Sequence, residues 1–509
     1  MTIADARSRR QDVGLVAGPI AALALGLALP DAYADSAGAV VPFTAAGRAT
    51  AAIAAWMAVW WLTEAISVYA TALLPLVLMP LLGAATIRSA AAPYAHELIF
   101  LFMGGFLIAL AMERWGLHRR VALATLRLVG DRASHVVGGF MLVSALLSMW
   151  VSNTATAIML LPVATSVIAL VARQLGVEAD SEVARDERSP IRNFALCMLL
   201  GIAYSASIGG MGTPIGTPPN VLLLSYVKTN LGIEIGFARW MALALPLVFV
   251  FLPLVWLLLT RVLYPLGIGR IEGGGRLIAD SLRALGPMNR GERIVLGVFV
   301  TAALLWVTRP LLTSLEIFGA RPLSGLSDAG IAMLCAMLLF VAPAERASRR
   351  FVLDWQTAVK LPWGILVLFG GGLSLAVAIQ ANGVGELLAS RVIGLSGVPS
   401  LVIVLAVVTV IVFLTELTSN TATTATLVPL LAALAPGIGL DPLLLIVPAA
   451  LGASCAFMMP VATPPNAIVF GSGLIPITAM SRAGFWLNWL GIGLITALAY
   501  TALMPMLAP

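Results

Sequence analysis

The sequence predicts an all-α membrane protein of about 11 transmembrane helices plus two re-entrant hairpins, arranged as inverted repeats. Of its 509 residues, 60% are hydrophobic and 11% are charged, and apolar runs near the ~20 residues that span a bilayer recur from end to end. The motif Ser-Asn-Thr occurs twice inside such runs, and its asparagines, Asn153 and Asn420, lie 267 residues apart. The same offset separates Ser148 from Thr415, which indicates an internal duplication.

Thirteen apolar segments are expected in the membrane. Their ranges are 13–30, 48–63, 67–87, 97–113, 134–172, 194–226, 240–262, 293–308, 329–343, 363–381, 399–436, 443–475 and 484–506. Four of them are too long for one helix and carry Gly, Pro, Ser, Thr or Asn near the middle. We expect re-entrant hairpins at 134–172 and 399–436, and interrupted helices at 194–226 and 443–475. The other nine are predicted to be single spans.

The duplication divides the chain into four parts. They are an N-terminal segment with the first transmembrane helix (1–47), a first inverted repeat (48–262), a cytoplasmic linker (263–292) and a second inverted repeat (293–509). The N-terminal part has a second interpretation, because arginines before an apolar run and Ala-Tyr-Ala at 32–34 also resemble a cleaved secretory signal over 1–34. A retained first helix is favoured, since the many spans that follow can use it for orientation.

The basic residues indicate the orientation in the membrane. With the N-terminus in the cytoplasm, 23 of the 30 Lys and Arg residues fall in loops on the cytoplasmic side, as the positive-inside bias predicts. The C-terminus is then outside, and a bacterial plasma membrane, the inner membrane, is the expected location, with lipid around the spans. Arginines flank the first hairpin more densely than the second, which predicts that the copies are inverted. The net charge of +6 is spread along the chain, so no nucleic-acid partner is expected.

Enzymatic chemistry is not indicated. Cys197, Cys335 and Cys455 stand alone inside apolar runs, so neither a disulfide framework nor a thiolate metal site is expected. A membrane enzyme would need clustered His, Asp or Glu within the membrane, and the chain offers only the isolated Glu416 there. A passive channel is disfavoured, because the motifs lie on hairpins rather than along a continuous pore.

The two Ser-Asn-Thr motifs have the chemistry of a cation site. At a hairpin tip their side-chain oxygens and freed carbonyls are neutral, hard ligands that suit Na+, and Asn and Thr can also donate to an anion. Thr-Pro-Pro-Asn, at 217–220 and at 463–466, breaks a helix and presents the positive N-terminus of the next half-helix. The four segments carry no Arg or Lys away from their ends, so an anionic substrate would need bound cations for charge balance. A single such motif would more simply indicate hydrogen bonding between helices.

Two carboxylates lie close to apolar segments. Glu64 lies near a predicted cytoplasmic boundary and is expected at the interface. Glu416 directly follows Thr415, and two roles stay open for it. It could support a cation from behind the ligands, or it could serve packing.

Several stretches of the chain resemble a known family. They are WWLTEAISVYATALLPLVLMPLLG (60–83), FLFMGGFLIALAMERWGLHRR (100–120), both Ser-Asn-Thr hairpins and both Thr-Pro-Pro-Asn stretches, and the likeness runs from about residue 50 to 500. These stretches resemble the divalent anion/sodium symporter family, in its di- and tricarboxylate carrier branch. The resemblance implies a homodimeric, elevator-type transporter, in which the hairpins and interrupted helices of each protomer slide along a scaffold.

The resemblance also implies ligands. The first Na+ site would use Ser148, Ser152, Asn153 and the carbonyl of Gly216. The second Na+ site would use Thr415, Ser419, Asn420 and the carbonyl of Ala462. Substrate carboxylates would contact Asn153, Thr154, Thr217, Asn420, Thr421, Thr463 and Pro464.

The function implied is sodium-coupled symport of C4-dicarboxylates, of the succinate, malate and fumarate class, into the cell, with Na+ as the coupling ion. Two alternatives within the same fold are a sodium-independent dicarboxylate exchanger and a carrier of citrate or sulfate. Symport is favoured because the cation positions carry small hydroxyls and no basic side chain that could replace Na+.

Overall fold

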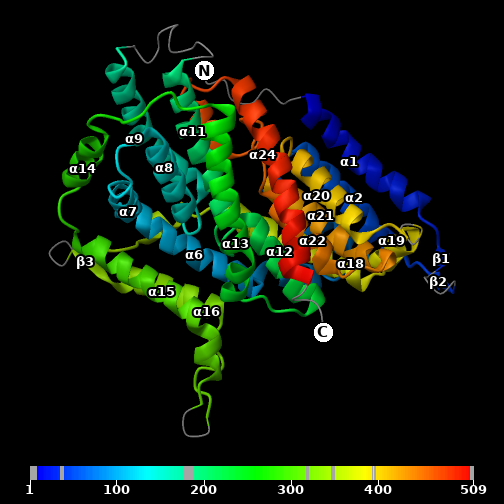
Figure 1. The fold of residues 1–509 in the computed structure, drawn as a ribbon. Coiled ribbons are helices and arrows are strands. Elements are labelled where there is room, and N and C mark those ends of the chain that lie inside the picture. Colours follow the sequence, from blue (N-terminus) through cyan, green and yellow to red (C-terminus); the bar gives the residue numbers. More distant parts are fainter. Residues whose placement is uncertain are drawn as a thin grey trace.

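The computed structural model is predominantly helical (Figure 1) and describes residues 9–34, 39–176, 189–316, 320–345, 350–392, 394 and 397–504. The charged stretch at 173–192 lies largely outside these residues, as do five of the 23 basic residues counted above on the cytoplasmic side. The strands within the described residues form two antiparallel pairs, β1 (Ala32–Ala34) with β2 (Val40–Pro42) and β3 (Pro343–Glu345) with β4 (Arg350–Phe351).

The helices before the linker carry the first copy of the motifs. They are α1 (Arg9–Ala28), α2 (Ala45–Thr63), α3 (Val68–Thr71), α4 (Leu74–Leu81), α5 (Ile87–Ala91), the 3-10 turn η1 (Ala92–Ala95), α6 (Glu97–Arg114), α7 (Leu117–Leu126), α8 (Ala133–Ser148), α9 (Asn153–Gln174), α11 (Pro190–Gly210), α12 (Pro218–Leu231), α13 (Phe237–Leu257) and the π-helical turn η2 (Leu258–Leu263).

The remaining helices are α14, which lies in the linker, and the helices that carry the second copy. They are α14 (Gly274–Ala284), α15 (Arg290–Ser314), α16 (Asp328–Val341), α17 (Trp355–Ala358), α18 (Trp363–Ala381), α19 (Val384–Val392), α20 (Ser400–Thr415), α21 (Asn420–Leu434), the 3-10 turn η4 (Ala435–Ile438), α22 (Pro442–Ala453), α23 (Pro464–Phe470), α24 (Ile477–Leu498) and the π-helical turn η5 (Ala499–Leu503).

Many helices in the described part of the chain are apolar along their length. Nine there are long and apolar enough to cross a membrane, and five further apolar helices are shorter. Three of the shorter ones, α8, α20 and α22, belong to the segments that were expected to be hairpins or interrupted helices. The all-α, multi-span class is therefore confirmed, whereas the number of 11 crossings stays a prediction.

Both expected hairpins are present as helix pairs with a short break at Ser-Asn-Thr. The first break lies between α8 and α9, at 149–152, and the second lies between α20 and α21, at 416–419. In each copy the serine of the motif is the N-cap of the second helix. The Ser152 hydroxyl accepts from the Ala155 N–H at 3.1 Å, and the Ser419 hydroxyl accepts from the Ala422 N–H at 3.5 Å.

Both interrupted helices are also present. The chain leaves helical geometry at 211–217 between α11 and α12, and at 454–463 between α22 and α23. Each following helix begins with two prolines, which fit the first turn because the N–H groups there have no partner within the helix. The second break is the longer of the two, so the copies differ in their unwound backbone.

The single span predicted over 67–87 is wrong. The segment forms two short helices, α3 and α4, followed by the start of α5. The Trp61 indole donates to Val68 O at 3.0 Å, but this carbonyl keeps its helical bond from the Ala72 N–H at 3.2 Å. The helix is interrupted because Pro75, in the first turn of α4, has no N–H to donate to Thr71 O, and because the Tyr94 hydroxyl donates to Ala72 O. A Cβ on Gly371 of α18 would lie 2.2 Å from the same Ala72 carbonyl oxygen, so the chain is closely packed at this break.

The helix expected over 13–30 is present as α1 and packs closely on α2. A Cβ on Gly14 would lie 2.1 Å from Thr63 Oγ1, and one on Gly18 would lie 2.5 Å from the Trp60 ring. Small residues at such contacts let two helix backbones approach, which is the usual way that helices associate in lipid.

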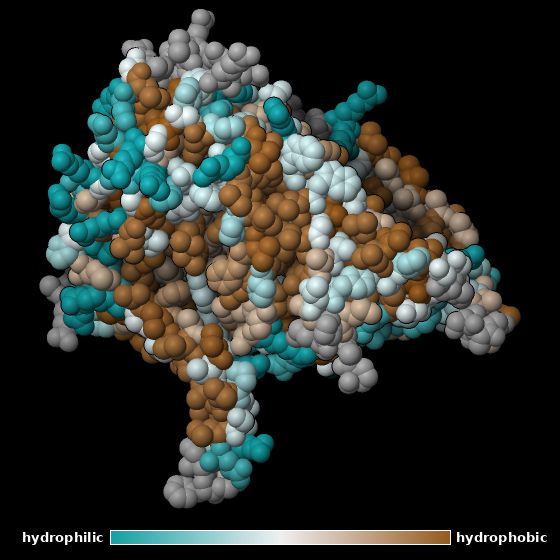
Figure 2. Space-filling view, in the orientation of Figure 1, coloured by the Kyte–Doolittle hydropathy of each residue, from teal (hydrophilic) through white to brown (hydrophobic). Residues whose placement is uncertain are grey.

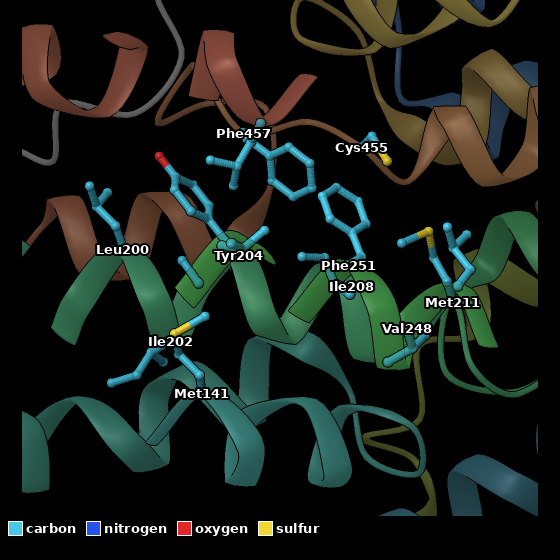
Figure 3. Packing of buried hydrophobic residues seen from close by; sticks show 14 of the residues in the cluster. Met141, Leu200, Ile202, Tyr204, Ile208, Met211, Val248, Phe251, Cys455 and Phe457 are labelled. Atoms are coloured by element: carbon cyan, nitrogen blue, oxygen red, sulfur yellow. The ribbon is translucent and has the colours of Figure 1, made fainter. Parts of the chain in front are cut away.

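The breaks and hairpins share one apolar core. Figure 3 shows Tyr204 of α11 and Phe251 of α13 on either side of Phe457, which lies in the break between α22 and α23. The ring centroids of Tyr204 and Phe457 are 5.3 Å apart, and the Tyr204 hydroxyl donates to Met480 O at 3.2 Å. Residues of the two copies are therefore packed against each other in a region that positions both breaks.

Candidate functional site

One cavity joins both hairpin tips and both helix breaks. Its volume is about 700 Å³. The residues that line it from these four places are Ser152, Asn153, Thr154, Ile215, Gly216, Thr217, Pro218, Pro219, Leu417, Thr418, Ser419, Asn420, Thr421, Val461, Ala462, Thr463, Pro464 and Pro465. The two Ser-Asn-Thr motifs, distant in sequence, thus contribute to a single site.

The expected substrate ligands all line this cavity. They are Asn153, Thr154, Thr217, Asn420, Thr421, Thr463 and Pro464. Of the expected cation ligands, Ser152, Gly216, Ser419 and Ala462 line it as well. Ser148 and Thr415 do not; both are fully buried behind the two asparagines. The geometry brings the residues together, and their assignment to individual ligands stays a prediction.

The asparagine of each Ser-Asn-Thr motif, Asn153 or Asn420, contacts a buried hydroxyl group in the same way. The Ser148 hydroxyl lies in hydrogen-bond contact with Asn153 Oδ1 and 2.6 Å from Ala206 O. The Thr415 hydroxyl lies 2.7 Å from Asn420 Oδ1 and 2.9 Å from Ala453 O. A hydroxyl has one proton and cannot satisfy two acceptor oxygens at once.

Three oxygens therefore meet around a single proton in each copy. Buried oxygens that lack hydrogen-bond donors are costly unless another positive group satisfies them. A hard, monovalent cation such as Na+ prefers such neutral oxygen ligands, so the residues present fit the ion that the sequence predicts.

Gly210 borders the first of these oxygen clusters. A Cβ built on Gly210 would lie 3.1 Å from both Asn153 Oδ1 and Gly216 O. These oxygens belong to two of the residues predicted to bind the first Na+, so the missing side chain leaves room beside them. Sequence reasoning did not single out Gly210. Its place in a Gly-Gly pair at the end of α11 is a signal that could have found it.

The last residue of each Thr-Pro-Pro-Asn motif supports the break. Asn220 is fully buried, and its amide group donates to Thr213 O at 2.8 Å and to Gly210 O at 3.2 Å. Asn466 is buried likewise and donates to the carbonyls of Met459 and Ala456, at 3.0 and 3.1 Å. These carbonyls precede each asparagine by seven and ten residues in both copies, so the side chain closes the unwound loop.

Glu416 is a support of the second break. One carboxylate oxygen accepts from the N–H of Phe457 at 2.7 Å and from the Asn488 amide at 2.8 Å. Met458 donates to both oxygens at 2.9 and 3.0 Å, and Met459 donates to the other oxygen at 3.2 Å. The side chain is 3% exposed. It therefore fastens the tip of the second hairpin to the break between α22 and α23 and to α24.

Four charged residues from outside the hairpins and breaks also line the cavity: Arg10, Glu64, Glu113 and Lys360. The Arg10 guanidinium donates to Leu417 O at the second tip, at 2.7 Å, and to Leu62 O at the end of α2. Glu64 ends α2 with a φ of 51°, a left-handed conformation that lets the chain turn sharply there. The sequence predicts Glu64 at the cytoplasmic interface and gives Arg10 no role, whereas both residues line the cavity.

Comparison with known proteins agrees with this arrangement. The family described as "Sodium:sulfate symporter transmembrane region" matches residues 40–507. The sodium-dependent dicarboxylate transporter SdcS of Staphylococcus aureus strain USA300 is 42% identical over 452 residues, which are 88% of this chain and 84% of that protein.

Two solved structures share the fold. The YdaH transporter of Alcanivorax borkumensis has a TM-score of 0.58 at 15% identity, over 96% of this chain and 97% of its own. MtrF of Neisseria gonorrhoeae, described with a class of antimetabolite efflux pumps, has a TM-score of 0.59 at 12% identity, over 97% and 95%. At these identities the likeness concerns the fold alone. From the family match and the relative, the chain belongs to the sodium:sulfate symporter family, the divalent anion/sodium symporters, which are membrane transporters and not enzymes.

Proposed function

We propose that this protein carries C4-dicarboxylates into the cell by symport with Na+. The observation that carries the proposal is the single cavity at which both Ser-Asn-Thr tips and both Thr-Pro-Pro-Asn breaks meet. The 42% identical relative is named a sodium-dependent dicarboxylate transporter, which supports the same ion and substrate class.

Helix N-termini at the cavity favour an anion. The helices α9, α12 and α21 begin at Asn153, Pro218 and Asn420, and all three residues line the cavity. The N-terminus of a helix carries partial positive charge and attracts carboxylates. The hydroxyl of Thr217 makes no capping hydrogen bond to α12, so its proton and lone pairs stay free for a ligand.

Charge balance links the anion to the cation. A dicarboxylate brings two negative charges to a site between apolar helices, where uncompensated charge is costly. When bound, Na+ supplies positive charge beside this cavity. The protein would hold Asn153 and Asn420 so that one face of each hairpin tip contacts Na+ and the other face contacts the dicarboxylate. Binding of Na+ and binding of the dicarboxylate would then depend on each other.

The remaining expectations belong to the same proposal. The protein would be a homodimer with its N-terminus in the cytoplasm and its C-terminus outside. The hairpins and interrupted helices would move across the membrane as one body, as the family likeness implies. The paired supports of the breaks favour such a body, because they join the tips to the interrupted helices.

Uptake into proteoliposomes tests the proposal. We expect labelled succinate to accumulate under an inward Na+ gradient and not under an equal K+ gradient. Unlabelled malate and fumarate should compete, and citrate and sulfate should compete poorly. If internal succinate exchanges for external succinate at the same rate with and without Na+, the protein is instead an exchanger. Accumulation of sulfate would establish a sulfate carrier of the same fold.

A further inference from the structure

A second cavity, apart from the one described above, lies where α8 begins and η2 ends. Its volume is about 600 Å³, and it shares no lining residue with the cavity at the hairpin tips. The residues that line it are Arg132, Ser134, His135, Trp256, Thr260, Arg261, Pro265, Leu266, Ile268, Gly269 and Arg270. We propose that this cavity binds the phosphate headgroup of an anionic phospholipid.

Within the part of the chain that the structure describes, the positive charge of the cavity has no acidic partner. Three arginines and one histidine line it, and among the described residues that line it none is acidic. Arg132, Arg261 and Arg270 make no ion pair with any residue that the structure describes. The neighbouring Asp131 forms no ion pair with these arginines in the described structure, and its Oδ1 accepts from the Gly275 N–H at 3.1 Å.

The backbone holds two of these arginines against their mutual repulsion. Arg132 and Arg270 face each other in an antiparallel β-bridge. Two hydrogen bonds fix the pairing, from the Ala133 N–H to Gly269 O at 3.0 Å and from the Ile271 N–H to Asp131 O at 2.7 Å. Like charges directly opposite each other are destabilising, and an anion between them removes that cost.

The start of α8 adds to the attraction for an anion. Ser134 and His135 lie in its first turn and line the cavity, and the N-cap residue Arg132 offers no side-chain acceptor to the helix. α8 is 16 residues long, so its N-terminus carries the partial positive charge of a full helix. Guanidinium groups bind phosphate oxygens in pairs, which suits a phosphodiester better than a simple halide.

The other wall of the cavity is apolar, which argues for a lipid rather than a free ion. The Trp256 indole donates to Ser134 O at 2.9 Å, so its ring is held between α13 and α8. Beyond it the outer face of α13 and η2 is strongly exposed at Phe249, Leu257 and Val262, by 67%, 44% and 66%. An acyl chain can lie on this strip while its headgroup meets the arginines.

The location agrees with the orientation expected from charge. Figure 2 shows hydrophilic residues gathered at the upper left of the molecule, around the part where Figure 1 shows α14, with hydrophobic surface below. All three arginines belong to loops predicted to be cytoplasmic. A basic pocket beside spanning helices on that side is where anionic headgroups are usually bound.

The test compares lipids retained by the full-length protein. The probes are phosphatidylglycerol, phosphatidylcholine and, separately, inorganic phosphate, added to protein in detergent. Native mass spectrometry counts bound lipid, and thermal unfolding measures stabilisation. We expect wild-type protein to retain phosphatidylglycerol and to be stabilised by it, with little effect of phosphatidylcholine or inorganic phosphate.

The decisive variant is Arg132→Gln with Arg261→Gln and Arg270→Gln. Each arginine near anionic lipid contributes about a fivefold factor, so the triple variant should lose on the order of a hundredfold in affinity for phosphatidylglycerol. The matched control, Arg127→Gln with Arg276→Gln and Arg293→Gln, removes the same charge from exposed positions on the same predicted side. It should bind as the wild type does.

Three results would overturn the proposal. They are equal retention by the triple variant and the wild type, equal loss in the control variant, and stabilisation by inorganic phosphate as strong as that by lipid. If the triple variant does not fold, Arg261→Gln alone decides, since Arg261 is exposed. It should bind phosphatidylglycerol several-fold more weakly, and unchanged binding there would equally contradict the site.

Discussion

The two hairpin tips share their expected ligand groups but differ in the first residue of the break. Glu416 stands in the second copy, and Met149 stands at the same offset in the first. Glu416 holds three consecutive N–H groups of the second break. In the first copy the ties are neutral, because the Thr213 hydroxyl donates to Met149 O and the Trp240 indole donates to Met211 O.

The difference shows which parts of the duplication are constrained. The groups that face the cavity are nearly the same in both copies, since both tips must meet one ligand. The residues that support the breaks from behind differ between the two copies, because any set of contacts that holds a break in place is sufficient. The second break is longer than the first, and a carboxylate is a side chain that can accept from several of its N–H groups at once.

The largest effect is expected at the groups that the two tips have in common. Asn153→Ala and Asn420→Ala each remove an oxygen of the expected cation site and a donor to the substrate. Each should lower succinate uptake by at least about a hundredfold, because such a site loses several kcal/mol when a buried partner is removed. Uptake into proteoliposomes measures this. Thr165→Ala, at an exposed hydroxyl of α9, is the control and should transport normally.

The next effect distinguishes the two copies. Glu416→Gln replaces a carboxylate, which only accepts hydrogen bonds from the backbone N–H groups, by an amide whose nitrogen is a donor. A hydrogen bond to a charged group contributes about 1.5–3 kcal/mol. We expect the thermal midpoint to fall by several degrees and the Na+ concentration for half-maximal uptake to rise.

Met149→Leu is the matched change at the first tip. It conserves volume and breaks no side-chain hydrogen bond in the described structure, so it should cost less than about 1.5 kcal/mol and leave the Na+ dependence unchanged. Equal effects of the two variants on the midpoint would contradict the assigned difference between the tips.

A third change makes the first break resemble the second. Asn220 and Asn466 are 246 residues apart, and the same offset from Gly210 leads to Ala456. Ala456 is therefore the counterpart of Gly210 in the second copy. Gly210→Ala places a methyl group 3.1 Å from Asn153 Oδ1 and from Gly216 O. We expect about a tenfold higher Na+ requirement, about 1.4 kcal/mol, with folding retained. Na+-dependent thermal stabilisation and Na+-dependent uptake should shift together. Gly297→Ala on α15, where nothing lies within 4 Å, is the control.

The smallest effect concerns a contact that only the second tip makes. Arg10→Gln removes the charged donor that joins Leu417 O at this tip to Leu62 O at the end of α2. The contact is exposed, so its loss should change the rate of succinate uptake by less than about fivefold. The neighbouring Arg9→Gln should have no effect, and a complete loss of uptake in Arg10→Gln would show that this residue binds the substrate.

Much of the site could be predicted because its signals are local. Proline pairs interrupt a long helix and fit the first turn of the next one, and Ser-Asn-Thr both caps a helix and offers oxygens. The hairpins and breaks were therefore located close to their observed bounds. What the sequence could not show depends on partners that are distant along the chain. The N–H groups bound by Glu416 lie about 41 residues away, and the carbonyl bound by Arg10 lies 407 residues away.

The wrong prediction at 67–87 has a cause that is only partly distant. The segment is apolar and long enough for one span, but its own Pro75 has no N–H to donate to Thr71 O and lies in the first turn of α4. Distant contacts add to the break, because the Tyr94 hydroxyl donates to Ala72 O and α18 packs against the same carbonyl at Gly371. The amphipathic helices α7 and α14 were missed for another reason, since they were short polar pieces within loops.

In the proposed Na+ sites, the serine caps of the two hairpins would link ion binding to the conformation of the backbone. The Ser152 oxygen that accepts the Ala155 N–H is the same atom expected to face Na+, and Ser419 is placed identically. An ion bound at either serine would therefore share an oxygen with the hydrogen bond that caps the first turn of α9 or α21. In the proposed sites, ion binding and the winding of that turn would be coupled through one atom.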